Sequence, residues 1–308
     1  MKSDKKISIC IPVYNGANTI AELVEELIEK LLMYEIEIIL INDGSNDDSE
    51  KICIDLYNRF ELIKFISLRK NFGEHNAVLC GLNYSCNDYI VIIDDDFQNP
   101  PSEILKLIEK ADSSNCDVVY SKYTSKKHHW LRNLGSSFND VVASSLLDKP
   151  KGLYLSSFKL IKKDIVDEII KYNGPFPYID GLILRVTDNI DSVIVEHRTR
   201  ETGESNYTFR KLVSLWLNMF VNFSIKPLRL ALIVGIIISL LSFITGILFL
   251  IEKIVNPGIS MGWTSLIVSV LFLSGIQLIF MGLIGEYLGK QYLDQNNTPY
   301  AVIKKVHL

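Results

Sequence analysis

Short apolar runs alternate with segments of helical spacing along roughly the first 120 residues of this 308-residue chain. The runs are rich in isoleucine, valine and leucine, as buried strands are, and the segments between them repeat apolar residues every three or four positions. Predicted strands cover residues 6–14, 37–42, 62–67, 89–93 and 117–121, and predicted helices cover 17–33, 48–60, 74–84 and a segment that begins at Pro101. This alternation predicts an α/β domain with a mostly parallel sheet and helices on both faces.

The region from residue 122 to about residue 207 has a less regular pattern. We predict a helix over 130–146 and strands over 153–161 and 192–196. The next segment, 208–222, gathers aromatic and aliphatic residues on one helical face. Such a segment is typical of a helix lying at a membrane interface, and an ordinary core helix is the alternative, since amphipathicity alone does not separate the two.

Two long uncharged stretches follow, from about residue 230 to 251 and from about 263 to 285. Each has about 22 mostly apolar residues, enough at ~1.5 Å per residue to cross a ~30 Å hydrocarbon core. The alternative is a buried hairpin inside a soluble core. The expected organisation is a soluble domain over 1–207, a juxtamembrane amphipathic helix over 208–227, two transmembrane helices within 228–289, and a tail over 290–308.

The distribution of lysine and arginine predicts how this hairpin is oriented. Cations precede the first stretch and follow the second, whereas the short connection carries Lys253 beside Glu252. By the positive-inside rule, both termini and the soluble domain are expected to be cytoplasmic, in a multi-pass protein of the cytoplasmic (inner) membrane. No N-terminal signal peptide is visible in the first residues.

Overall composition narrows the classes of function. The net charge of −4 gives no sign of nucleic-acid binding. The five cysteines are scattered and form no Cys-x-x-Cys pair, which indicates reduced thiols in a cytosolic domain rather than zinc ligands. The chain also lacks a Gly-x-Gly-x-x-Gly after its first strand and any Gly-Lys-Ser/Thr, so a dinucleotide redox enzyme and a P-loop nucleotidase lose support.

Polar residues follow several of the predicted strands. Ligands of parallel sheets bind beyond the carboxyl ends of the strands, where Tyr14, Asp43 and the cluster Asp94-Asp95-Asp96 fall. Asp94 and Asp96 alternate along an extended segment, so both carboxylates can bind one Mg²⁺ or Mn²⁺ that bridges to phosphate oxygens. A solvated acidic turn is the alternative, although three adjacent acids repel one another without a cation.

Other candidate residues carry weaker signals. Asp43 suits a contact to ribose or base, but Asn-Asp-Gly-Ser is also a plain turn. Arg69 follows the third strand and either meets a diphosphate or belongs to a surface turn. Arg132 and Ser136 lie one helical turn apart and suit a phosphate clamp, with Lys122 upstream. The basic, glycine-containing segment around Arg200 is either a closing loop or a linker.

Several segments together resemble glycosyltransferase family 2, and within it the polyprenyl-phosphate glycosyltransferases. That subgroup includes dolichyl-phosphate mannose synthases and bacterial undecaprenyl-phosphate glucosyl and formamido-arabinosyl transferases. The segments that carry the resemblance are 11–15 (IPVYN), 42–45 (NDGS), 69–77 (RKNFGEHNA), 94–101 (DDDFQNPP), 200–207 (RETGESNY) and 282–292 (GLIGEYLGKQY). Their joint order is specific and covers nearly the whole chain.

The resemblance implies an A-type glycosyltransferase fold, related to the Rossmann fold, and inverting, metal-dependent transfer. A sugar would pass from a nucleotide-sugar donor to polyprenyl (undecaprenyl) phosphate at the cytoplasmic membrane face, for cell-envelope glycan or lipid modification. By this resemblance Asp94 and Asp96 hold the metal, Asp96 is catalytic, and Lys122, Arg132 and Ser136 bind the acceptor phosphate. The nucleotide-sugar ligands would be Pro12, Tyr14, Asn15, Asp43, Arg69, Asp94, Asp95, Gln98 and Arg200.

This sequence departs from the family pattern at the expected catalytic base. An Asp usually precedes the strand near residue 155, but here the stretch reads Gly152-Leu153-Tyr154. Asp180 is the candidate substitute acid. Alternatively no base is needed, because a phosphate monoester with a second pKa of ~6 is mostly a dianion at neutral pH.

Three other functions remain open. A processive polysaccharide synthase would carry Gln-x-x-Arg-Trp, which does not occur in this sequence. A membrane transferase that adds sugar to a lipid-linked glycan and a catalytically silent membrane scaffold are the other two. Gly275, Gly282 and Gly285 in the second apolar stretch would permit close helix packing in a homo-oligomer.

Overall fold

A computed structural model describes residues 5–123, 150, 152–198, 226–256 and 262–308. The chain divides into two compact units: Met1–Tyr207 together with Asn297–Leu308, and Thr208–Asn296. The predicted helix over 130–146 and the amphipathic segment 208–222 lie outside the described residues.

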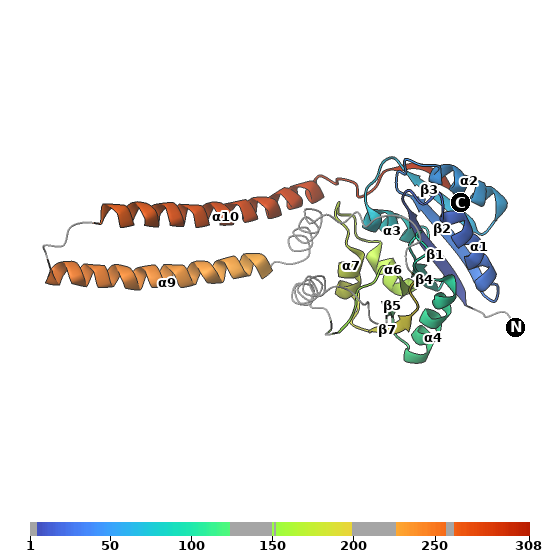
Figure 1. Cartoon of the computed structure of the whole chain (residues 1–308), viewed down its shortest axis with the longest axis horizontal. Coiled ribbons are helices and arrows are strands. Elements are labelled where there is room, and N and C mark those ends of the chain that lie inside the picture. Colours follow the sequence, from blue (N-terminus) through green and yellow to red (C-terminus); the bar gives the residue numbers. More distant parts are fainter. Residues whose placement is uncertain (1–4, 124–149, 151, 199–225, 257–261) are drawn as a thin grey trace. The chain divides into compact units, whose positions relative to one another are not determined.

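The first unit is built on one eight-stranded sheet (Figure 1), with strand order β7-β5-β6-β4-β1-β2-β3-β8. The strands are β1 (Lys6–Val13), β2 (Glu35–Asn42), β3 (Ile63–Leu68), β4 (Tyr89–Ile92), β5 (Val118–Tyr123), β6 (Lys159–Lys162), β7 (Ile190–Val195) and β8 (Ile303–His307). The β1–β2, β1–β4, β2–β3 and β5–β7 pairs are parallel, while β6 is antiparallel to both of its neighbours and β8 is antiparallel to β3. The prediction of a mostly parallel sheet is confirmed.

Helices cover both faces of this sheet, as the alternating pattern predicts. Helices α1 (Ile20–Lys30), α2 (Ser49–Arg59) and α4 (Ile104–Ser114, after the 3₁₀ turn η1, Pro101–Glu103) pack on one face. Helices α3 (Glu74–Leu82), α6 (Lys163–Ile169) and α7 (Ile179–Val186) pack on the other.

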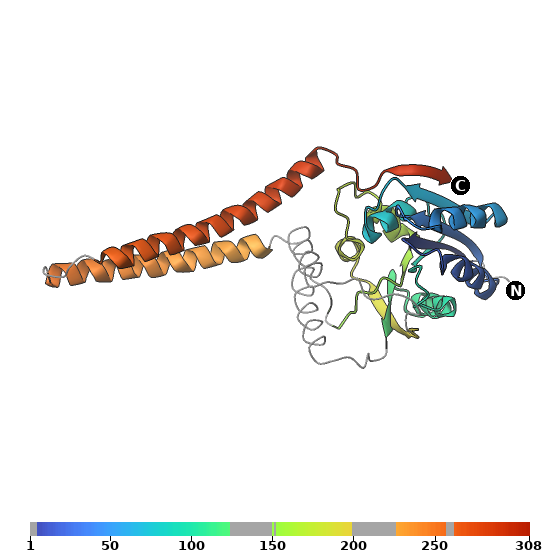
Figure 2. The same cartoon turned by 45° about the horizontal axis from the view of Figure 1, so that its top comes forward.

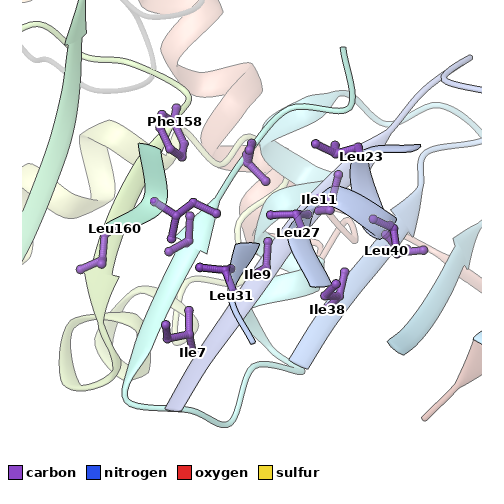
Figure 3. Packing of buried hydrophobic residues seen from close by; sticks show 14 of the residues in the cluster. Ile7, Ile9, Ile11, Leu23, Leu27, Leu31, Ile38, Leu40, Phe158 and Leu160 are labelled. Atoms are coloured by element: carbon purple, nitrogen blue, oxygen red, sulfur yellow. The ribbon is translucent and has the colours of Figure 1, made fainter. Parts of the chain in front are cut away.

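The central strand β1 shows why the two layers form. Ile7, Ile9 and Ile11 belong to the cluster on the α1 side, where Figure 3 shows Ile9 and Ile11 beside Leu27. The intervening Cys10 belongs to the opposite cluster, which contains α3. Since alternate side chains of a strand face opposite sides, a run that is apolar at nearly every position requires cover on both.

Some boundaries differ from the sequence predictions. Helix α1 is shorter than the predicted 17–33, because the Gly16 carbonyl accepts the backbone N–H of Thr19 and of Ile20 in a turn before the helix. Strand β6 is shorter than the predicted 153–161. Helices α6 and α7 were not predicted, and neither was β8, which lies within the segment treated as a tail.

The second unit contains the two apolar helices, α9 (Lys226–Val255) and α10 (Trp263–Gln295). They run alongside each other in both views (Figure 1, Figure 2). Ala231–Leu248 and Phe272–Gln295 are long and apolar enough to cross a membrane, and none of their residues is buried in protein. A bilayer would supply the apolar surroundings that this surface lacks in water.

Candidate active site

The loops that follow β1, β2 and β4 are hydrogen-bonded to one another at the carboxyl edge of the sheet. The backbone N–H of Tyr14 donates to Asp95 Oδ2 at 3.0 Å, and that of Asn15 donates to Ser45 Oγ at 3.0 Å. Asn46 N donates to Asn15 Oδ1 at 2.9 Å. Asn15 has a φ of +55°, a left-handed conformation that asparagine tolerates better than most residues. The predicted gathering of three strand ends is therefore present.

The acidic cluster forms a tight turn directly after β4. Asp94 Oδ2 accepts a hydrogen bond from Ser157 Oγ at 2.5 Å, which joins the turn to the segment leading into β6. Asp96 Oδ1 accepts the backbone N–H of Gln98 at 3.1 Å, and Phe97 between them has a φ of +62°. The two predicted metal ligands are thus held by neighbouring structure rather than by each other.

Asp95 has a different position from its two neighbours. Its carboxylate accepts the Tyr14 N–H and lies so close to Gly16 that a Cβ there would be 2.4 Å from Oδ2. Only glycine at position 16 leaves room for this contact. Asp95, predicted as a donor ligand, joins the β1 and β4 loops.

Asp43 also differs from expectation. It is only 3% exposed, and its two oxygens accept the backbone N–H groups of Phe72 at 2.7 Å and Gly73 at 2.9 Å. Burial raises its pKa, although these two hydrogen bonds act in the opposite direction. The Asp43 carboxylate, predicted to contact the nucleoside, therefore positions the loop after β3. Tyr14, by contrast, is exposed at the end of β1.

The remaining predicted ligands are spread along the same edge. Arg69 is exposed at the end of β3, and its backbone N–H donates to Val302 O at 2.9 Å. Pro12 is buried in β1 opposite Ile41. Lys122 is exposed near the end of β5, which runs in the same direction as β4 because both are antiparallel to β6. Arg132, Ser136 and Arg200 lie outside the described residues.

Asp180, the candidate substitute for the missing base, is buried in an ion pair with Lys159. Its Oδ1 also accepts a hydrogen bond from Tyr120 Oη at 2.8 Å. The carboxylate is therefore already engaged by a buried cation and by a phenol donor. This arrangement argues against Asp180 as a free general base.

Sequence reasoning missed a cavity of about 110 Å³ beside the acidic turn. Its wall includes Glu74 and His75 from the first turn of α3, Ser157 and Lys159 around the start of β6, and Tyr178 before α7. Glu74 belongs to segment 69–77 (RKNFGEHNA) and directly follows Gly73, between a predicted strand and a predicted helix. This position was the sequence signal that could have marked Glu74 as a site residue.

The charges around this cavity shift two pKa values. Burial, followed by the nearby Asp94, raises the pKa of Glu74 to about 7, with Lys159 acting in the opposite direction. Burial lowers the pKa of His75 to about 4, so its imidazole is neutral near pH 7. The cavity therefore combines a neutral ring, an internal ion pair and one accessible carboxyl group.

The donor atoms of the acidic turn suit a hard divalent cation. Carboxylate oxygens are ligands that Mg²⁺ and Mn²⁺ prefer, and Mg²⁺ commonly takes one or two carboxylates plus substrate phosphates. Within the described ranges no group of three or more His, Cys, Asp or Glu residues could hold a metal by itself. Asp94 and Asp96 therefore fit a cation that is completed by phosphate oxygens.

Comparison with known proteins identifies both parts of the chain. Residues 8–170 match the profile of "Glycosyl transferase family 2", and residues 226–290 match that of the "GtrB C-terminal hairpin". Relatives named undecaprenyl-phosphate 4-deoxy-4-formamido-L-arabinose transferase are 32% identical in Yersinia enterocolitica and 31% identical in Enterobacter sp., over 98% of this chain and 94% and 93% of theirs.

Solved structures show the same fold. Glucosyl-3-phosphoglycerate synthase from Mycobacterium tuberculosis, in complex with Mn²⁺, UDP and glucosyl-3-phosphoglycerate, superposes with a TM-score of 0.51 at 19% identity. The match covers 71% of this chain and 77% of that one. The first unit has the A-type glycosyltransferase fold. This chain belongs to glycosyl transferase family 2 and is a glycosyltransferase.

Proposed function

We propose that this enzyme transfers a sugar, with inversion, from a nucleotide-sugar to polyprenyl (undecaprenyl) phosphate at the cytoplasmic face of the membrane. One observation carries the proposal. A single chain joins the carboxylates Asp94 and Asp96, at the donor edge of a family 2 domain, to two helices long and apolar enough to cross a bilayer. Relatives along its full length are named as undecaprenyl-phosphate transferases.

In the reaction the bond between the anomeric carbon and the donor's β-phosphate oxygen breaks, and the electron pair leaves with the nucleoside diphosphate. An oxygen of the acceptor phosphate forms the new bond from the opposite face. Asp94 and Asp96 would hold a Mg²⁺ or Mn²⁺, which when bound neutralises charge on the diphosphate. Ser157 and the Gln98 backbone keep the two carboxylates in place, and Arg69 offers a cation at the same edge.

The acceptor removes the need for a protein base. A phosphate monoester with a second pKa of ~6 is largely a dianion at neutral pH, so its oxygen attacks without prior deprotonation. This agrees with the absence of an acid in Gly152-Leu153-Tyr154 and with the ion-paired state of Asp180. Lys122, Arg132, Ser136 and Arg200 are proposed to bind the acceptor phosphate and the diphosphate.

The chain's own path supports a hairpin with both ends on one side. Strand β8, which follows α10, pairs with β3 in the same sheet that contains β1. If α9 leaves the cytoplasmic side, the chain has to return there before β8, and two crossings achieve this. The excess of lysine and arginine outside the connection supports the cytoplasmic assignment.

The test is to incubate membranes carrying the protein with labelled nucleotide sugars and undecaprenyl phosphate. We expect label from one donor to enter the organic phase as a polyprenyl-phosphate sugar. Label that appears only on an added lipid-linked glycan would support the glycan-transferase alternative. Nucleotide binding or hydrolysis that needs a divalent cation would argue against a silent scaffold, and the absence of any transfer would overturn the proposal.

A further inference from the structure

The cavity beside Asp94 is too small for a nucleotide. Its volume is about 110 Å³, which is space for a few water molecules or for part of a sugar ring. Its lining combines polar side chains with the apolar Val78, Ile92 and Ile179. Such a space suits one edge of a monosaccharide with its substituent.

Its position fits the sugar of the donor. Ser157 lines the cavity and donates to Asp94 Oδ2 at 2.5 Å. If Asp94 holds the cation that binds the donor diphosphate, as the proposed function requires, the sugar lies nearby, since only one bridging oxygen separates its anomeric carbon from the β-phosphorus. The cavity is the enclosed space next to it.

Most polar groups on the cavity wall are already engaged. Asp180 is paired with Lys159 and accepts from Tyr120, and His75 packs edge-on against Tyr178 with ring centroids 5.0 Å apart. Glu74 differs, because it keeps solvent-exposed surface although the surrounding protein removes much of the water near its carboxyl group, and no hydrogen bond or ion pair of this side chain is found among the described residues. Its carboxyl group is therefore an accessible acceptor on the cavity wall.

We propose that this cavity receives the transferred sugar and that Glu74 determines which sugar is used, by accepting a hydrogen bond from a hydroxyl or amide N–H on the ring. In either protonation state a carboxyl group offers an oxygen that accepts a hydrogen bond, so a sugar substituent with a donor satisfies it. A deoxy analogue leaves it desolvated and unpaired, which is a strong ground for rejection. Glu74 is thus a specificity residue of the family 2 reaction.

The chain offers a matched control for this test. Glu22 also lies in the first turn of a helix, is exposed, and is far along the sequence from the cavity residues. Glu74→Gln and Glu22→Gln therefore make the same chemical change, each in the first turn of a helix. Glu74→Ala removes the acceptor altogether, and thermal unfolding checks that each variant is folded.

The experiment measures kcat/KM for the donor that supports transfer and for analogues that each lack one hydroxyl or amide donor. We expect the wild type to reject one analogue by about 100-fold. Glu74→Ala should lower kcat/KM for the parent donor by about 100-fold and leave that analogue within about threefold, so that the discrimination disappears. Glu74→Gln should fall between, and Glu22→Gln should match the wild type.

Affinity for the donor's nucleoside diphosphate alone, with Mn²⁺, should change less than about twofold in the Glu74 variants, because the diphosphate does not enter the cavity. Unchanged sugar preference in active Glu74 variants would overturn the inference alone. An equal loss for every donor, with weaker nucleoside diphosphate binding, would also overturn it. A wild type that uses no nucleotide sugar would instead overturn the proposed function together with this inference.

Discussion

Three adjacent aspartates at the end of β4 have three different environments. Asp94 is held by Ser157, Asp96 by the Gln98 backbone, and Asp95 by the Tyr14 backbone. The first and third share the role expected of metal ligands, whereas the middle one joins two loops. Identical side chains in a row therefore do not predict identical effects of mutation.

Replacing Asp96 with alanine should lower sugar transfer by at least about 100-fold, because the cation that offsets charge on the leaving diphosphate loses a ligand. The fold should persist, since the hydrogen bond that the carboxylate accepts from Gln98 N is local to the turn. Initial rates and thermal unfolding of purified protein would check both. Asp55→Asn, on the exposed side of α2, is the control. Near-normal turnover in Asp96→Ala would refute the metal assignment.

Asp43→Ala should reduce the free energy of unfolding by about 1–3 kcal/mol, because two half-buried backbone N–H groups lose their acceptor. The affected groups belong to Phe72 and Gly73. Asp43→Asn keeps one acceptor oxygen and should lose less. Denaturant unfolding in detergent would rank the three proteins, and an unperturbed Asp43→Ala would show that the loop does not depend on this contact.

Glu74 should make stability depend on pH. Burial, Asp94, Asp180 and Asp95 raise its pKa from 4.5 to about 7 and Lys159 acts against them, so the folded protein holds this proton more tightly than the unfolded chain. Its stabilising contribution is complete below pH 4.5 and is lost as the pH rises to about 7. With a chelator present, Glu74→Gln should therefore gain melting temperature relative to the wild type between about pH 5 and about pH 8. A constant difference between the two proteins would contradict this.

The sequence could locate the strand ends, because the acidic cluster and Tyr14 directly follow runs too apolar to be exposed. It could not assign partners to Asp43 or Asp180. The partner of Asp43, Phe72, is set by how a loop closes, and the partner of Asp180, Lys159, is set by the order of the strands. Neither arrangement can be recognised from the residues next to these aspartates in the sequence. Glu74 was overlooked for the same reason, since its surroundings come from four separate elements.

Among the secondary-structure elements, β8 differs most from the sequence prediction, because it is a strand of the sheet where a tail was expected. This strand extends the sheet beyond β3, with His307 packing against Phe65 and Tyr57 and Lys304 forming an ion pair with Glu50. The first five strands were predictable because helices bury them on both faces. Strand β8 is mostly exposed and carries two lysines, so its sequence resembles a charged tail.

Deleting residues 303–308 should lower the stability of the first unit by about 2–4 kcal/mol, because the β3–β8 ladder and the half-buried Ile303 and His307 are lost. Lys304→Ala, which removes only an exposed ion pair, should cost less than about 1 kcal/mol. Thermal unfolding compares the two. Equal stability of the truncated and full-length chains would mean that β8 does not contribute to the fold.

For the whole molecule, the pairing of β8 with β3 means that the chain starts from and returns to one folded unit. Apolar stretch length and charge placement were sufficient to predict two helices, because crossing a bilayer depends on local composition. Helices α9 and α10 extend beyond the predicted apolar stretches, 230–251 and 263–285. Apolar length predicts the segment that could cross a membrane, whereas the helix also includes polar residues at its ends.

Cysteine labelling should show both crossings. Among the native cysteines only Cys86 is exposed. In intact cells a membrane-impermeant maleimide should label Pro257→Cys, in the connection between the helices, in a Cys86→Ser background. It should label native Cys86 only after the membrane is permeabilised. Labelling of Cys86 in intact cells would place the first unit on the outer side and refute the orientation.

The central claim is that this enzyme uses a divalent cation, bound by aspartate carboxylates, to transfer a sugar to a polyprenyl phosphate in the membrane. The most direct measurement is the product formed by purified protein in lipid, given the preferred nucleotide sugar and undecaprenyl phosphate, with and without a chelator. We expect one polyprenyl-phosphate sugar for each nucleoside diphosphate released, loss of both products with the chelator, and recovery on adding Mg²⁺ or Mn²⁺. Undiminished sugar transfer in the chelator, or nucleoside diphosphate release without any lipid-linked sugar, would contradict the account.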